Sequence, residues 1–332
     1  MQKSANNGAK PAISIVLPVY NGSRWIASSI GCVLNQRCTD FELIVIDDGS
    51  TDDSWSVICS IVDPRIRASR QVNIGLASTL NVGIRLARAD LVARQDQDDW
   101  MHPERLARQA DFMHKHPECA AVGTWAEIRE DDVPSGRYHK HPLGNAALRM
   151  SLLFDNPFVH SSMMLRRDAV LAKGGYCEDR ARQPPEDYEL WSRLAPHHEV
   201  ANIGQVLTAY REVASSMSRT GTSPFQRNVL QISTENLAKM LVPVFTEEEC
   251  RSLSSLYHGV SGETEGSCLP RCKALEMTHA AAVAVAGDPS TWSEEFATVH
   301  ARLSARVAAQ STRRHFPKFV LGVGRALRRA LA

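Results

Sequence analysis

Three carboxylates stand within four residues of this 332-residue chain, in the segment Asp96-Gln97-Asp98-Asp99. They directly follow the apolar run Leu91-Val92-Ala93. Carboxylates packed this closely repel one another unless a cation lies among them, and their hard oxygens suit Mg²⁺ or Mn²⁺. A second acidic pair, Asp47-Asp48, follows the largely apolar run 41–46. Two apolar runs that are each followed by acids predict one polar site with a divalent cation in it.

The apolar runs that precede the acids predict buried strands, and helical patterns separate them. Strands are predicted at 13–19, 41–46, 66–70, 91–94, 120–124, 162–165 and 206–210, and helices at 25–34, after 49–53, at 77–87, 104–115 and 146–153, and from Pro185. This alternation predicts an α/β fold with a mostly parallel central sheet flanked by helices. Ligands bind outside the carboxyl ends of such strands, where both acidic segments lie.

Two local patterns add detail to this arrangement. Ser50 and Asp53 have the spacing of a capping box, which predicts a capped helix after the turn 49–53. The polar stretch 129–145 contains two prolines and two glycines and predicts a long loop.

Composition narrows the class of protein. The formal net charge is +1 and 43% of the residues are hydrophobic, which fits a globular protein and argues against a nucleic-acid binder. The polar residues 1–11 show no signal-peptide pattern, and no run is apolar over the roughly 18 residues that a membrane span needs. The eight cysteines lack zinc-site spacing, so reduced thiols are expected. A cytoplasmic protein is predicted.

The strand pattern stops after about residue 220. We therefore predict a flexible N-terminus at 1–11, an α/β domain at 12–220 and a helical region at 221–332, with helices at 226–241, 247–257, 270–286 and 293–310. From Phe296 to Ala332 there are eight Lys or Arg and no acid. The segment beyond Pro317 has a basic amphipathic pattern, which suits either an anionic membrane surface or docking onto the protein itself.

Five segments, in this order, resemble the inverting family-2 glycosyltransferases of GT-A fold. They are Leu17–Asn21, Ile46–Asp52, Asn73–Ala77, Asp96–Asp99 and Glu186-Asp187, and the resemblance covers roughly residues 12–215. It implies metal-dependent transfer of a sugar from a nucleoside-diphosphate-sugar donor to a glycan or lipid-linked acceptor. It also implies a place in bacterial surface-glycan assembly (lipopolysaccharide, capsule or exopolysaccharide), at the inner face of the membrane.

The resemblance assigns donor binding to Pro18, Tyr20, Asp48, Asn73 and Gly75. A carboxylate suits a base N–H or a ribose hydroxyl because it offers only acceptors. An ordinary helix cap is the alternative for Asp48, and a simple turn is the alternative for Asn73 and Gly75.

The resemblance assigns metal binding to Asp98 and Asp99, with Asp98 also near the donor and Asp96 in support. It makes Asp187 the catalytic base and Glu186 a residue that orients it. The alternative for both clusters is a set of acids that stabilise a helix N-terminus.

Three further residues are less specific. His160 and Trp191 are candidates for the acceptor side, with a structural histidine and a core tryptophan as the alternatives. Arg211 is a candidate for the donor diphosphate. Many family members carry a His two residues after this Arg, whereas this chain has Val213, so the role of the following loop is open.

Two other functions compete with the glycosyltransferase. An acidic pair after a strand also resembles the metal-binding acids of a phospho-acceptor receiver domain, but that fold is shorter and leaves Asp96–Asp99 and Glu186-Asp187 unexplained. The second competitor is a sugar-nucleotide-binding protein without activity, which the sequence does not separate from an enzyme.

Overall fold

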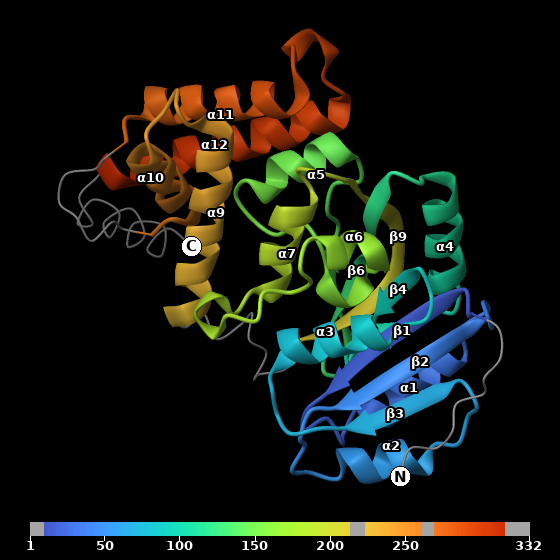
Figure 1. Ribbon diagram of the computed structural model, residues 1–332. Helices are drawn as coiled ribbons and strands as arrows, with labels where there is room; N and C mark the ends of the chain where they lie inside the picture. Colours follow the sequence, from blue (N-terminus) through green and yellow to red (C-terminus); the bar gives the residue numbers. More distant parts are fainter. Residues whose placement is uncertain (1–9, 213–222, 261–268, 316–332) are drawn as a thin grey trace, which may run out of the picture. The chain divides into compact units, whose positions relative to one another are not determined.

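The computed structural model describes residues 10–212, 223–260 and 269–315. The predicted basic helix beyond Pro317 and most of the predicted flexible N-terminus lie outside these residues. Two compact units make up the chain, coloured by sequence in Figure 1. The first comprises Met1–Leu148 and Asn156–Asn228, and the second comprises Arg149–Asp155 and Val229–Ala332.

One half of the central sheet of the first unit is made of parallel strands. Strand β1 (Ile13–Val19) pairs with β2 (Phe41–Asp47) on one side and β4 (Leu91–Arg94) on the other, and β3 (Ile66–Arg70) pairs with β2. All residues of β1 and β2 are buried. Their runs are apolar on both faces because helices cover both faces.

Helices α1 (Ile26–Leu34) and α2 (Ser54–Ser60) pack with one face of this half-sheet, whereas α3 (Leu76–Leu86) lies against the other (Figure 1). The predicted buried face of α3 is confirmed, since Ala77, Leu80, Ile84 and Ala87 are all buried. The strands and helices of this half end within one or two residues of the predicted bounds.

The second half of the sheet is mixed. The strand order is β3-β2-β1-β4-β8-β6-β9-β5, with β7 on β6. Strand β8 (Met164–Arg166) runs antiparallel to β4 and to β6 (Cys119–Glu130), and β9 (Glu199–Glu212) runs parallel to β6 and antiparallel to β5 (Trp100–Met101). The α/β class with flanking helices is confirmed, but the parallel arrangement holds throughout only in the first half.

The predicted loop at 129–145 is wrong in its first part. Strand β6 continues to Glu130, turns through Asp131 at φ 54°, and pairs antiparallel with β7 (Val133–His139). A turn this short cannot carry the crossover that a parallel pair needs. Strand β7 is mostly exposed, so it lacks the apolar alternation that marks a strand in sequence.

The predicted capping box at the start of α2 is also wrong. Asp53 is the N-cap residue, but its side chain makes no cap hydrogen bond. Asp52 instead accepts from the backbone N–H of Ser54 at 3.0 Å, and the Ser50 hydroxyl accepts from the N–H of Asn21 at 3.0 Å. Ser50 is thus used to hold the loop after β1, a long-range contact that spacing does not reveal.

The remaining elements of the first unit carry the acidic and polar segments that follow the strands. They are α4 (Arg105–Lys115), α5 (Asn145–Leu152), α6 (Arg167–Ala172), α7 (Glu186–Leu194) and two 3₁₀ turns at His160–Ser162 and Arg180–Arg182. Helix α5 continues into the second unit at Arg149.

The four helices predicted after residue 220 are confirmed as α9 (Ser223–Leu241), α10 (Glu247–His258), α11 (Arg271–Ala286) and α12 (Glu294–His315). A capping box at Thr246 and Glu249 opens α10. None of the helices described is long and apolar enough to cross a bilayer. The seven cysteines within the described ranges are all free.

Glu42, the second residue of the largely apolar strand β2, is a buried acid that the sequence did not explain. Its carboxylate is only 2% exposed and accepts from the Ser14 hydroxyl at 2.6 Å, from Arg67 at 2.7 Å and from Arg88 at 2.8 Å. Burial opposes the charge, but these donors outweigh it and hold the pKa of Glu42 below its usual value.

We predict that Glu42→Ala lowers the free energy of unfolding by about 1–3 kcal/mol, because the buried Ser14 hydroxyl loses its acceptor and the partly exposed Arg67 and Arg88 lose their ion-pair partner. Urea denaturation measures the loss. Asp90→Ala is the matched control, since Asp90 pairs with Lys10 at an exposed position and such pairs contribute at most about 1 kcal/mol. Equal losses in the two variants would contradict the structural role of Glu42.

Candidate functional site

Asp48 ties the end of β2 to the loop that precedes α3. Its two carboxylate oxygens accept from the backbone N–H groups of Ile74 and Gly75, each at 2.9 Å, and from the Gln71 side chain at 2.8 Å. Asn73 donates to the backbone carbonyl of Asp48 at 2.9 Å. The predicted donor residues Asp48, Asn73 and Gly75 therefore lie together, and Asp48 shapes the loop.

Glycine is needed where this loop meets the turn after β2. A Cβ on Gly49 would lie 2.7 Å from the backbone nitrogen of Asn73, closer than real contacts allow, and Gly49 has a φ of 77°. Gly75 also has a positive φ, at 92°. Both backbone conformations favour glycine over other residues.

The loop after β1 is joined to the acidic run by Gln97. The Gln97 side chain accepts from the N–H of Tyr20 at 2.9 Å and donates to the carbonyl of Tyr20 at 3.1 Å. Tyr20 itself is 49% exposed. Pro18 is buried in β1, two residues before this loop.

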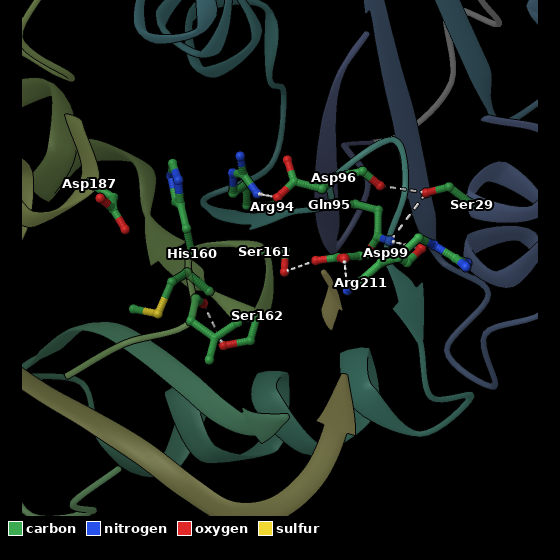
Figure 2. A network of polar contacts seen from close by, with 12 residues as sticks. Ser29, Arg94, Gln95, Asp96, Asp99, His160, Ser161, Ser162, Asp187 and Arg211 are labelled. Carbon is green, nitrogen blue, oxygen red and sulfur yellow. Dashed lines mark hydrogen bonds and ion pairs between the residues drawn. The ribbon is translucent and has the colours of Figure 1, made fainter. Parts of the chain in front are cut away.

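The acidic run itself is held by different partners at each position (Figure 2). Asp96 forms an ion pair with the buried Arg94, the last residue of β4. Asp99 accepts from the Ser161 hydroxyl and, at 2.8 Å, from the backbone N–H of Arg211. Asp98, between them, remains partly exposed.

Arg105 holds the segment before the acidic run through hydrogen bonds, a role that the sequence analysis did not predict. Its side chain is fully buried in α4 and donates to the Gln109 side chain, the Gln95 side chain and the Arg94 carbonyl at 3.0, 3.2 and 2.8 Å. Burial lowers the pKa of this guanidinium to about 9. Arg105 and Gln109 lie on the helix face that also buries Leu106 and Met113, which is the signal that the sequence offered.

Burial and mutual repulsion destabilise the charges of the acidic run. Burial and then Asp96 raise the pKa of Asp98 to about 6. Burial, Asp96 and Asp98 raise the pKa of Asp99 well above its ordinary value. A divalent cation would relieve this repulsion, and carboxylate oxygens are the ligands that Mg²⁺ and Mn²⁺ prefer, so the residues fit such an ion. Asp98 is the best placed of the three, because both oxygens of Asp99 already accept hydrogen bonds.

These carboxylates are not a complete ligand set. Within the described residues no three His, Cys, Asp or Glu side chains form a group that would hold a metal ion by themselves. A cation here would take further oxygen ligands besides these carboxylates.

A second acidic pair lies at the start of α7. Asp187 accepts from the Asn156 side chain at 2.7 Å and from the N–H of Tyr188 at 2.8 Å. Glu186 is 6% exposed and faces His160, whose Nδ1 lies 3.9 Å from the glutamate Oε1. Burial raises the pKa of both acids, that of Glu186 to about 7 with Asp187 as the next cause.

Arg94 lies between the two acidic groups. In Figure 2 its guanidinium stands between His160 on one side and Asp96 on the other. Its positive charge lowers the pKa of Asp98 and of Asp187, although burial acts more strongly on both in the opposite direction. One buried cation thus acts on both carboxylate groups that the sequence analysis selected.

Arg211 has a different setting from the predicted loop. It lies in β9 and is 8% exposed, with Nε donating to the Asp98 carbonyl at 2.7 Å and its guanidinium stacked 3.9 Å from the Trp25 ring centroid. It also pairs with Asp132 at 2.5 Å. Arg211 therefore supports the acidic run from the side, and Val213 lies outside the described residues.

Trp191 does not offer a platform for an acceptor sugar. It is 0% exposed and packs edge-on against Phe158 and His160, with ring centroids 5.8 and 6.1 Å away. The core alternative is the correct one, because the helix face that carries it is buried. His160 is placed beside the acids of α7, in contact with Tyr176 at 2.8 Å.

Comparison with known proteins identifies the relatives of this chain. Residues 14–175 match the family model described as "Glycosyl transferase family 2". The chain is 28% identical over 255 residues to the O-antigen biosynthesis glycosyltransferase WbnJ of Escherichia coli, covering 74% of this chain and 94% of WbnJ. It is 27% identical to the amylovoran biosynthesis glycosyltransferase AmsE of Erwinia amylovora, covering 68% and 85% of the two chains.

Solved structures share the fold. TarS residues 1–349 of S. aureus, in complex with UDP-GlcNAc, match with a TM-score of 0.57 at 16% identity, covering 90% of this chain and 89% of TarS. The mannosyltransferase PcManGT of Pyrobaculum calidifontis, in complex with GDP-Man and Mn²⁺, matches with a TM-score of 0.53 at 16% identity, covering 93% and 88%. The predicted GT-A fold is thereby confirmed.

We predict that Asp48→Ala releases the loop before α3, because the N–H groups of Ile74 and Gly75 lose their acceptor. Each of these two N–H groups loses one hydrogen bond to a charged acceptor, which contributes about 1.5–3 kcal/mol. Amide hydrogen exchange should therefore become at least about tenfold faster at both positions. Asp53→Ala is the control, since the Asp53 carboxyl is exposed and makes no cap hydrogen bond. Unchanged exchange at Ile74 and Gly75 would refute the role of Asp48.

Proposed function

Because this chain belongs to glycosyltransferase family 2, we propose that it transfers a sugar from a nucleoside-diphosphate-sugar donor to an acceptor hydroxyl, with inversion and with a divalent cation. The observation that carries the proposal is the pair of carboxylate groups on either side of Arg94, one just after β4 and one at the start of α7. The first group suits a diphosphate with its cation, and the second suits a hydroxyl that must lose a proton.

On the donor side we assign the nucleoside to Tyr20 and to the loop that Asp48 holds. Tyr20 offers an exposed ring, and the loop brings the Asn73 and Gly75 backbone to the end of β2. Pro18 lies in β1, two residues before Tyr20, and Arg211 donates to the Asp98 carbonyl. We therefore give Pro18, Asp48 and Arg211 a positioning role beside the donor.

For the cation we assign Asp98 as the principal ligand, with Asp99 and Asp96 in support. A bound Mn²⁺ or Mg²⁺ would neutralise the charge that develops on the leaving nucleoside diphosphate. Asp98 presents a partly exposed carboxylate, whereas Asp99 is held by Ser161 and the Arg211 N–H, and Asp96 by Arg94. This division refines the equal assignment of Asp98 and Asp99 made from the sequence.

We assign Asp187 as the base that accepts the proton of the acceptor hydroxyl. Its pKa is raised by burial, which brings a carboxylate closer to the range in which general bases act. One base opposite one leaving group is sufficient for a single in-line displacement, which inverts the anomeric centre. Glu186 and His160 lie beside it, and their part is argued below.

The relatives suggest the setting. WbnJ and AmsE are named for O-antigen and amylovoran biosynthesis, so we propose a bacterial surface polysaccharide, with a glycan or lipid-linked acceptor, as the product of this chain. We expect the enzyme at the cytoplasmic face of the membrane, with its C-terminal segment as a candidate contact. The family match favours this function over a receiver domain, and an inactive nucleotide-binding protein remains the competitor that kinetics must test.

Donor and cation binding are testable by thermal shift with UDP, GDP, dTDP and ADP, each with and without Mn²⁺. We expect one nucleoside diphosphate to raise the melting midpoint over its rivals, and only with Mn²⁺, because a ligand of the native state stabilises it. Asp98→Asn should weaken this Mn²⁺-dependent binding at least about tenfold. Binding should also weaken as the pH falls below about 6, because protonated Asp98 cannot bind the cation.

Asp111→Asn is the control for this experiment, since the Asp111 carboxyl is exposed on α4 and pairs with Lys115 on the same helix. If no nucleotide stabilises the chain, the proposed function fails. If Asp98→Asn binds as tightly as Asp111→Asn, the cation assignment fails.

We predict that Asp187→Asn lowers transfer from the bound donor by about 10²–10⁴-fold, the usual contribution of a general base, while Mn²⁺-dependent nucleotide binding is retained. Single-turnover transfer and calorimetric titration measure the two quantities. Asp168→Asn, at a carboxyl 87% exposed on α6, is the matched control. Full transfer by Asp187→Asn would reassign the base, and absence of transfer by the unmodified chain would favour the inactive competitor.

A further inference from the structure

We propose that the two acids at the start of α7 hold one proton between them, that this proton is on Glu186, and that His160 is the positioning residue that keeps it there. Asp187 is thereby left ionised as the base. This inference rests on the proposed function and concerns the same site. It assigns different ionisation states to two adjacent acids that the sequence does not distinguish.

The hydrogen bonds of Asp187 favour its ionised form. One oxygen accepts from the Asn156 side chain at 2.7 Å and the other from the N–H of Tyr188 at 2.8 Å. N–H donors stabilise a carboxylate over a neutral carboxyl group. Both contacts lower the pKa of Asp187 against the stronger effect of burial.

His160 presents the opposite environment to Glu186. Burial, and next the charge of Arg94, lower the pKa of His160 well below its ordinary value, so its ring is neutral and carries a single N–H. Its Nε2 lies 2.8 Å from the Tyr176 hydroxyl, and its Nδ1 faces Glu186 Oε1 at 3.9 Å. If Nε2 carries the hydrogen and donates it to Tyr176, Nδ1 presents a lone pair to Glu186. At 3.9 Å the two groups interact electrostatically without a hydrogen bond, and the lone pair favours a neutral Glu186 over an ionised one.

The charges around Glu186 agree with this tautomer. Asp187 faces Glu186 from the same helix, Arg94 and Asp96 from the end of β4, His160 from its 3₁₀ turn and Tyr176 from the segment after α6. Among these groups Arg94 is the cation, and it is already paired with Asp96. If both acids of α7 were ionised, three negative charges, counting Asp96, would share the single positive charge of Arg94. Protonation of Glu186 removes one of these negative charges.

The other tautomer has a distinct consequence. If Tyr176 donates to Nε2, the hydrogen of His160 is on Nδ1 and would stabilise an ionised Glu186. The proton shared by the pair would then have to be on Asp187, where it would block acceptance of the hydroxyl proton. During transfer under our proposal, Asp187 gains the proton of the acceptor hydroxyl and Glu186 neither gains nor loses one.

Infrared difference spectra of the full chain test the location of the proton without any substrate. Well below the pKa of about 7 for Glu186, the band of a protonated carboxyl group should be lost in Glu186→Gln and kept in Asp187→Asn, each compared with the unmodified chain. In Asp187→Asn the band should disappear at a lower pH, because the charge of Asp187 no longer raises the pKa of Glu186. Loss of the band in Asp187→Asn and its survival in Glu186→Gln would overturn the proposal. So would an identical spectrum for all three proteins.

The role of His160 is tested by the pH at which this band disappears. His160→Phe removes the Nδ1 lone pair and Tyr176→Phe frees the tautomer, so both should move the midpoint down by about 0.5–1 pH unit, a modest shift for a change in one neighbouring polar group. His160→Gln, which keeps a side-chain acceptor, should recover part of the shift. A purely structural role for His160 would leave the midpoint in place.

Circular dichroism melting shows which variants are folded. If His160→Phe does not fold, Tyr176→Phe provides the test. A midpoint that is unchanged or raised in the folded variants would overturn the assignment of His160. The nucleotide screen reports separately on the proposed function: chain that binds Mn²⁺ with UDP or GDP but shows no Glu186 band refutes the proton assignment alone. A Glu186 band without any nucleotide binding refutes the function alone.

Discussion

The structure depends on placing several buried acids close together in one unit of the chain. Each buried carboxylate loses its hydration, and each neighbouring acid adds repulsion, so the arrangement requires cations and N–H donors to reach the same place. Arg94 pairs with Asp96, Arg211 donates to the Asp98 carbonyl, and Arg105 holds the backbone and side chains of the segment that precedes them. Arg105 itself has no carboxylate partner in these contacts, and burial lowers its pKa to about 9.

This requirement explains the mixed half of the sheet. The partners of the acidic run come from distant parts of the sequence, since the Arg211 N–H reaches Asp99 across 112 residues and the Ser161 hydroxyl reaches it across 62. Strand β8 must lie beside β4 to place the 3₁₀ turn with Ser161 there, and β9 must pass beside β5 to place Arg211. The parallel half supplies the strand ends and Arg94, and the mixed half adds Ser161 and the backbone of Arg211.

The sequence predicted what local patterns encode. The strands of the parallel half and the helices after residue 220 have strong periodicity, and the acids of the site stand out because unpaired acids after an apolar run are costly. Strand β7 was missed because an exposed edge strand needs no apolar alternation. Arg94, Arg105, Asn156 and Tyr176 were missed for a different reason: their importance lies in what they contact, and these contacts are long-range.

Repulsion between adjacent acids is relieved differently at the two ends of the site. At Asp98 the carboxylate is partly exposed and its partners are few, so the charge is left for an external cation to neutralise. At Glu186 the side chain is 6% exposed and faces a neutral histidine, so a bound proton neutralises the carboxylate instead of an external cation. Arg94 acts on both ends, because it lowers the pKa of Asp98 and of Asp187. An ion at the donor end therefore changes the field that Arg94 and Asp96 together exert on the base, so the two ends of the site are electrostatically coupled.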